Sequence, residues 1–189
     1  LPIFPCWNSY TAAMIGDHCI AAIGDAYIKG VRNFDIEKAY EAMRKNAFES
    51  PANKKDYQNG MGRRALQSYL KYGYIPLEDS VPDAFHTKEQ VSRTLEYAYD
   101  DFVLSQVAKQ LQKNEDYKLL SVRALNYRNV IDPQTGYAQG RHTDGTFLKE
   151  QNAFQFAKFI TEGATCHYTW YVPHDPYGLM EYMGGKEKF

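Results

Sequence analysis

The segment from residue 159 to residue 179, FITEGATCHYTWYVPHDPYGL, concentrates residues that could carry out acid–base chemistry. It holds Glu162, His167, His174 and Asp175 among several aromatic side chains. Ionisable side chains of this kind are costly to bury unless each has a partner or a task. One interpretation makes Glu162 a general acid, whose carboxyl the neighbouring rings desolvate so that it holds a proton near neutral pH.

The same segment also has a simpler interpretation. Thr161 is a typical N-cap residue, so Glu162 would lie in the first turn of a helix, where the helix dipole favours a carboxylate. Asp175 stands before Pro176, which suits the first position of another helix, so Asp175 would be its N-cap. His174, which has no such capping role, is then the more available of the two for a functional site.

Two further groups of polar residues interrupt apolar helical patterns. Asp100 and Asp101 either belong to a solvated helix face, or point into a cleft and accept hydrogen bonds from ligand hydroxyls. In the solvated interpretation Arg93 screens Glu96. His18 is either a hydrogen-bonded core residue or a ligand contact. His142 and Asp144 show no convincing metal-ligand spacing and are treated as loop residues.

The hydrophobic periodicity predicts an all-α chain of about seven helices. Asp35 is predicted to cap the second helix and Gly73 to end the third. In the longest helix, Thr87 and Gln90 form a capping box. Gly16 and Gly24 lie near one face and should let a neighbouring helix approach. Helices stacked in antiparallel pairs are compatible with either a bundle or an α/α toroid. The predicted elements are helices over residues 11–30, 36–47, 61–72, 87–112 and 114–127, one beginning near 161, one beginning after 175, and a loop or small hairpin over 132–147.

The composition restricts the function classes. The 189 residues are 44% hydrophobic and 24% charged, which suits one domain with a sizeable core. The net charge is −1 and the basic residues are scattered, which argues against a nucleic-acid partner. No apolar run is long enough to span a membrane. The three cysteines lack metal-ligand spacing and are expected to be free thiols. The chain has 16 tyrosines, an unusually high number. This fits a polar cleft in which the rings pack and the hydroxyls form hydrogen bonds.

Several motifs in order along the chain resemble the catalytic domain of glycoside hydrolase family 92, the calcium-dependent exo-acting α-mannosidases. The resemblance covers nearly the whole chain. It implies an (α/α)6 toroid whose polar cleft binds the terminal mannose of a glycan, with inversion at the anomeric carbon and Glu162 as the general acid. The motifs that carry it are MIGDHCIAAIGDAYIKGV, FDIEKAYEAM, YGYIP, VSRTLEYAYDDF, NYRNVIDPQTGYAQGR and TEGATCHYTWYVPHDPYGLMEYMGG.

The resemblance also sets expectations for the rest of the site. Calcium is the implied cofactor. The family's general base, and most of its calcium ligands, lie in a motif that this chain does not contain, so no metal ligand is assigned. Residues 1–189 are therefore expected to be part of a larger, secreted or periplasmic bacterial enzyme with an N-terminal β-sandwich domain. The residues expected to contact the substrate are His18, Asp100, Asp101, His167, Trp170, His174 and Asp175.

Two alternatives stay open from the sequence. A different toroid enzyme, such as a glucosidase or a trehalase-like hydrolase, would carry a similar aromatic and acidic cleft. A non-catalytic sugar-binding helical domain would use Glu162 only as a helix-start residue.

Overall fold

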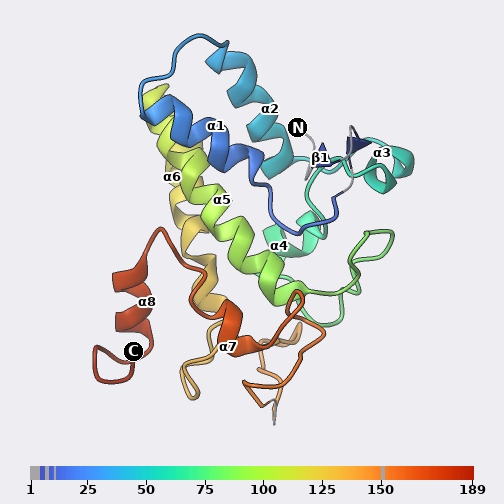
Figure 1. The fold of residues 1–189 in the computed structure, drawn as a ribbon, viewed down its shortest axis with the longest axis vertical. Coiled ribbons are helices and arrows are strands. Elements are labelled where there is room, and N and C mark those ends of the chain that lie inside the picture. The colour runs from blue at the N-terminus through green and yellow to red at the C-terminus, as the bar shows by residue number, and fades with distance from the viewer. Residues whose placement is uncertain (1–4, 7–8, 11, 150–151) are drawn as a thin grey trace.

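The computed structural model describes residues 5–6, 9–10, 12–149 and 152–189. This part of the chain is mainly helical, as predicted, and its small β-structure is a two-residue antiparallel pair near the N-terminus (Figure 1). The elements are β1 (Pro5–Cys6), β2 (Ser9–Tyr10), α1 (Cys19–Ile28), α2 (Ile36–Phe48), α3 (Lys54–Gln58), α4 (Leu66–Tyr72), α5 (Gln90–Gln110), α6 (Asn114–Arg123), the 3₁₀ segment η1 (Ala124–Asn129), α7 (Thr165–Tyr168) and α8 (Pro176–Tyr182).

The helix α5 forms the centre of the structure (Figure 1). All eight residues from 91 to 98 are buried, including polar ones. A helix buried on every side is a core helix rather than a surface helix. The short link over residues 111–113 returns the chain so that α6 packs antiparallel to α5. A Cβ atom at Gly24 of α1 would lie 2.4 Å from Cγ1 of Val103, so this glycine lets α1 approach α5 as predicted.

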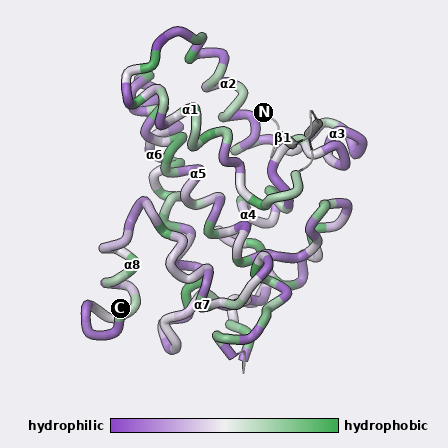
Figure 2. The backbone as a smooth tube through the Cα atoms, in the orientation of Figure 1, coloured by the Kyte–Doolittle hydropathy of each residue, from purple (hydrophilic) through white to green (hydrophobic). Residues whose placement is uncertain are grey.

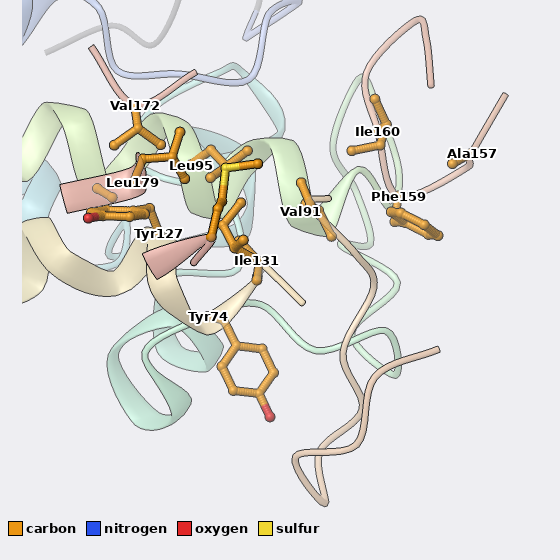
Figure 3. Close-up of a cluster of buried hydrophobic side chains, with 14 residues drawn as sticks. Tyr74, Val91, Leu95, Tyr127, Ile131, Ala157, Phe159, Ile160, Val172 and Leu179 are labelled. Carbon is orange, nitrogen blue, oxygen red and sulfur yellow. The ribbon is translucent and has the colours of Figure 1, made fainter. Parts of the chain in front are cut away.

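Two large apolar clusters lie along α5. One joins the C-terminal half of α5 to α1, α2 and α6, and includes Ile20, Met43 and Leu104. The other joins the N-terminal half of α5 to η1 and to the C-terminal segments, and Figure 3 shows Val91 and Leu95 within it. The hydrophilic helix α3 and the last residues of the chain lie at the periphery (Figure 2).

Local capping signals were predicted correctly at several ends. The Asp35 side chain accepts a hydrogen bond from the Lys38 N–H at 3.0 Å and caps α2. Gly73 ends α4 in the left-handed conformation with φ = 74°. The segment over residues 132–147 is a small hairpin region, with antiparallel bridges between Ile131 and Ala138 and between Arg141 and Phe147.

Other predicted helix starts were wrong. The predicted start at Thr11 lies outside the described residues, and α1 begins only at Cys19 because the N–H of Asp17 donates to a carboxylate oxygen of Asp100 at 2.8 Å. The third predicted helix begins at Leu66 rather than near residue 61, after Ala65 with φ = 50°. The short helix α3 was not predicted, so the described part contains eight α-helices and one 3₁₀ segment instead of about seven helices.

The long helix does not begin with the predicted capping box. It starts at Gln90 after Glu89, whose φ is 55°, and Thr87 lies outside it. The N–H groups of Glu89 and Val91 donate to the carbonyls of Lys158 and Phe159, so a distant segment satisfies this helix end. Among the residues that the structure describes, no helix has both the length and the apolar character needed to cross a membrane.

Candidate active site

A cluster of polar side chains surrounds Glu96 on α5. The Nε2 atom of His18 lies 3.1 Å from Oε2 of Glu96, and the Tyr168 hydroxyl donates to Oε1 at 3.3 Å. The carboxylate is 5% exposed, whereas the His18 side chain is 40% exposed and forms the open edge of the cluster. Burial raises the pKa of Glu96, and the charge of His18 opposes this shift. Tyr171 completes the cluster by a hydrogen bond with Glu96.

The absence of a side chain at Gly16 leaves room for the His18–Glu96 pair. A Cβ atom at Gly16 would lie 2.4 Å from Cε1 of His18 and 2.9 Å from Oε2 of Glu96. A side chain at this position would therefore displace the His18–Glu96 pair. Gly16 was predicted to allow the close approach of a helix, and here it allows the close approach of these two side chains.

The two tyrosines serve the cluster as hydroxyl donors. Burial is the main cause that raises the pKa of Tyr168 and of Tyr171, and the neighbouring Glu96 carboxylate raises both further. Both hydroxyls therefore stay protonated at neutral pH. A carboxylate, an imidazole and phenol hydroxyls are groups that can bind the hydroxyls of a sugar.

Asp100 lies one helical turn from Glu96, on the same face of α5. Its Oδ2 accepts the Asp17 N–H, and its Oδ1 lies 3.9 Å from Nδ1 of His18. Burial raises the pKa of Asp100 well above its usual range. The structure thus brings Asp100 and His18 together as neighbours, although the Asp100 side chain itself is fully buried.

Asp101 belongs to a different environment. It is fully buried and accepts hydrogen bonds from Arg63 at 2.7 Å, from Arg123 at 2.8 Å and from the Tyr69 hydroxyl at 3.0 Å. Consecutive helical residues point about 100° apart, so the side chains of Asp100 and Asp101 point in different directions. Asp101 therefore lies in an internal ion-pair network and not on a surface that a sugar reaches in this structure.

Glu162 lies in a turn that precedes α7, so the prediction of a helix start near Thr161 was wrong. The reason is a tertiary contact: the Thr161 N–H donates to Oγ of the buried Ser92 at 2.9 Å. Glu162 has φ = 52°, a left-handed conformation that costs a non-glycine residue roughly 1–2 kcal/mol. Its side chain is exposed, so in this structure the aromatic residues do not desolvate its carboxyl.

The turn of Glu162 lies next to the Glu96 cluster. Ser92, which holds this turn, and Glu96 are four residues apart on α5 and share a face, about 6 Å apart along the axis. Tyr168 of α7 also reaches Glu96. Segments distant in sequence therefore bring Glu162, Glu96 and His18 to the same end of α5. Backbone strain of this kind is typical of functional sites and motivates a functional hypothesis.

His174 and Asp175 are occupied by structural contacts. The His174 ring stacks on Phe102 with ring centroids 5.3 Å apart, and its Nε2 lies 2.9 Å from the Ala124 carbonyl oxygen. Burial lowers the pKa of His174, which favours a neutral imidazole that donates through Nε2. Asp175 caps α8 as predicted by accepting the Gly178 N–H at 2.9 Å, and it also accepts the Tyr127 hydroxyl at 2.8 Å.

His167 and Trp170 are both exposed. Nδ1 of His167 accepts the Ala164 N–H at 3.1 Å, so this nitrogen serves the start of α7. The Trp170 ring is 46% exposed and meets Phe189 edge-on, with ring centroids 5.4 Å apart. Neither residue contacts the Glu96 cluster through a hydrogen bond or ring contact found in the described part of the chain.

The central role of Glu96 was missed by sequence reasoning. The solvated interpretation paired Glu96 with Arg93, but Glu96 is buried beside His18, and Arg93 instead donates to the His86 carbonyl at 2.6 Å. The four-residue spacing of Glu96 and Asp100 indicated a shared acidic face. Nothing local indicated that His18 would lie against it.

The described part of the chain lacks a cluster of metal ligands. No group of three or more His, Cys, Asp or Glu side chains in the described ranges is arranged to hold a metal ion. Cys19 and Cys166 are free. The residues present therefore do not fit a calcium site by themselves.

Comparison with known proteins identifies the family. A family GH92 α-mannosidase from Bacteroides thetaiotaomicron has a similar structure, with a TM-score of 0.82 and 38% identity over 97% of this chain and 22% of its own. A second structure of that enzyme, in complex with mannoimidazole, gives a TM-score of 0.81 with 38% identity, covering 97% of this chain and 23% of its own. A family GH92 inverting mannosidase from Bacteroides thetaiotaomicron VPI-5482 gives a TM-score of 0.80 with 34% identity, covering 93% of this chain and 22% of its own.

A curated relative described as an uncharacterized secreted glycosidase, from Arthroderma benhamiae, is 29% identical over 199 residues, which is 92% of this chain and 25% of the relative. The chain thus spans about a quarter of the length of the proteins that it matches. The profile of the glycosyl hydrolase family 92 catalytic domain matches residues 1–189. The chain therefore belongs to glycosyl hydrolase family 92 and forms part of its all-α catalytic domain, an (α/α)6 toroid.

Proposed function

We propose that this chain is part of an exo-acting α-mannosidase that removes terminal α-linked mannose from glycans. The observation that carries the proposal is the 38% identity to a family GH92 α-mannosidase over 97% of the chain. The position of Glu162, exposed in a strained turn beside a polar cluster, supports it. Because the chain spans about a quarter of its relatives, we propose that it acts within a larger enzyme.

In this proposal Glu162 is the general acid. It donates its proton to the glycosidic oxygen while the bond between that oxygen and the anomeric carbon breaks. A second carboxylate, outside this chain, removes a proton from the water that attacks the opposite face of the sugar, which inverts the anomeric configuration. An inverting enzyme keeps its two carboxyl groups roughly 6.5–9.5 Å apart to make room for this water. The products are mannose and the shortened glycan.

The Glu96 cluster is proposed to contact the sugar through its exposed edge. His18 supplies that edge, and the Tyr168 and Tyr171 hydroxyls hold Glu96 in place behind it. Oδ1 of Asp100 lies 3.9 Å from Nδ1 of His18 and supports this ring. Trp170 and His167 are proposed as exposed substrate contacts, and His174, Asp175 and Asp101 would act through the packing of the site rather than by direct contact.

Calcium, the compartment and the partner domains belong to the same proposal. Since the described residues form no metal group, the calcium ligands are proposed to come from chain outside this segment, and no step here depends on them. A secreted or periplasmic location is supported by the secreted glycosidase among the relatives. An N-terminal β-sandwich domain and the remainder of the toroid are the proposed intramolecular partners.

The proposal is tested by the release of mannose from α-linked mannobiosides by the full-length enzyme, beside matched α-glucobiosides. We expect release from mannosides only, and a large loss of rate in Glu162→Gln with these poor leaving groups. Release of glucose instead would indicate a different toroid glycosidase. Binding of mannobiosides without hydrolysis by either protein would indicate a sugar-binding domain.

A further inference from the structure

We infer that Ser92 is a positioning residue that fixes the direction of Glu162, an inference that rests on the proposed function. Ser92 is fully buried near the start of α5, and its Oγ accepts the N–H of Thr161 at 2.9 Å. Thr161 directly precedes Glu162 in the turn. The Ser92 hydroxyl is therefore hydrogen-bonded to the residue next to Glu162, whose protonated carboxyl group would donate the proton.

The turn is held on both sides of Glu162. Before it, the Val91 N–H donates to the Phe159 carbonyl at 3.0 Å, which places residues 159–161 against the start of α5. After it, the Gly163 carbonyl accepts the Ala157 N–H at 3.1 Å. Between these anchors Glu162 has φ = 52°. A non-glycine residue keeps this conformation only where its surroundings enforce it, and the hydrogen bond to Ser92 is a side-chain contribution from α5 to these surroundings.

Loss of the Ser92 hydroxyl should change where the acid points. Alanine at this position would leave the Thr161 N–H buried without its acceptor, which is unfavourable, so the turn would relax to satisfy it. A general acid must come within hydrogen-bond reach of the oxygen that it protonates. A displacement of about 1 Å can lower a rate about 100-fold. Ser92 is fully buried, so its effect is transmitted through Glu162.

The test separates positioning of the acid from general damage by the choice of leaving group. In the full-length enzyme, Ser92→Ala should lower kcat for a mannobioside about tenfold to 100-fold, with KM nearly unchanged. An aryl α-mannoside with a strongly acidic phenol needs little protonation, so its kcat should change less than about twofold. Ser92→Cys, which keeps the size but accepts hydrogen bonds weakly, should give the same pattern and serves if the alanine variant does not fold.

Ser105→Ala is the matched control. Ser105 lies on the same helix and is also fully buried, but its hydroxyl donates to the Phe102 carbonyl of its own helix at 2.6 Å. This control should retain both activities. If Ser92→Ala and Ser92→Cys slow both substrates equally, or neither, the positioning role is overturned. If Glu162→Gln itself leaves mannobioside hydrolysis unchanged, the proposed function fails instead, so the two failures are distinguishable.

Discussion

The Nη1 atom of Arg63 lies 2.7 Å from Oδ1 of Asp101, and both side chains are fully buried. Nε of the same arginine lies 3.3 Å from Oδ2 of Asp17, so one guanidinium joins the segment before α1 to the middle of α5. Arg123 approaches Asp101 from α6 at 2.8 Å. Four parts of the chain therefore meet at these buried charges, namely the segments before α1 and before α4, the helix α5 and the helix α6.

Removal of this arginine should be strongly destabilising. Arg63→Met leaves two buried carboxylates short of positive charge, and breaking a buried ion pair in this way costs about 3–5 kcal/mol. Arg44→Met is the matched control, because Arg44 also lies 2.7 Å from a carboxylate, Asp116, but is 42% exposed. Its loss should cost less than about 1 kcal/mol. Denaturant titration measures both, and equal losses would contradict the role assigned to burial.

The stability contribution of Asp17 should depend on pH. Burial raises the pKa of Asp17 from its ordinary 3.8 to about 6, although Arg63 and Asn46 oppose the shift. A carboxyl with a raised pKa binds more protons in the folded than in the unfolded state between these two values. Its contribution to stability therefore falls as the pH rises from about 4 to about 6, and stays low above that.

Asp17→Asn removes this titration while keeping the shape of the side chain. The unfolding temperature of the variant minus that of the wild-type protein should therefore become more positive between pH 4 and pH 7. The comparison cancels the titration of groups that do not interact with Asp17. A difference that does not change with pH, or that becomes more negative, would contradict the raised pKa of Asp17.

His18 should affect sugar binding more than folding. His18→Ala removes the exposed edge of the cluster and the 3.1 Å contact with Glu96. Hydrogen bonds that involve charged groups contribute about 1.5–3 kcal/mol, so the affinity of the full-length enzyme for mannoimidazole should fall at least about tenfold. The control is His142→Ala, which removes an exposed pair with Glu78 at 2.6 Å. Calorimetry that finds equal affinities for the two variants would remove His18 from the proposed site.

Asp175 should stabilise the structure through two hydrogen bonds, beside a longer contact with Arg128 at 3.6 Å. Its side chain caps α8 and also accepts the Tyr127 hydroxyl, so Asp175→Ala should lose more stability than Asp35→Ala, which removes only the exposed cap of α2. A lost cap costs about 0.5–2 kcal/mol. Tyr127→Phe should account for the difference between the two alanine variants. If chemical denaturation gives the same loss for both, the Tyr127 bond contributes nothing measurable.

The 189-residue chain should be inactive alone, because the proposed general base and calcium ligands lie elsewhere. Mannose release by the full-length enzyme should stop after treatment with a chelator and return when calcium is added. The isolated chain should release no mannose from mannobiosides with or without calcium. Turnover by a verified 189-residue species would show that this chain holds the whole catalytic apparatus.

Parts of the fold that depend on neighbouring residues were predictable from the sequence. The N-caps Asp35 and Asp175 and the C-cap Gly73 act within a few residues of themselves. The late start of α1 and the turn at Glu162 were not predictable, because each is set by a bond to α5. The Asp17 N–H donates to the side chain of Asp100, which lies 83 residues later in the sequence. The Thr161 N–H donates to the side chain of Ser92, which lies 69 residues earlier. No local pattern contains that information.

The site was predictable to a similar degree. The spacing of Glu96 and Asp100 on one helix face indicated an acidic stripe. His18 was predicted as a possible ligand contact and Glu162 as a possible general acid. Whether such a stripe faces water or protein depends on which segments cover it. Here the residues before α1 and the tyrosines after Glu162 cover it, and they come from opposite ends of the chain.

The hydrogen bond between Ser92 and Thr161 also has a consequence for the order of folding. A chain leaves the ribosome from its N-terminus, so α5 is complete well before residue 161 has been added, and the Ser92 hydroxyl has no Thr161 to accept from. The His18–Glu96 side of the site can therefore form first, and the turn that bears Glu162 is set in place last.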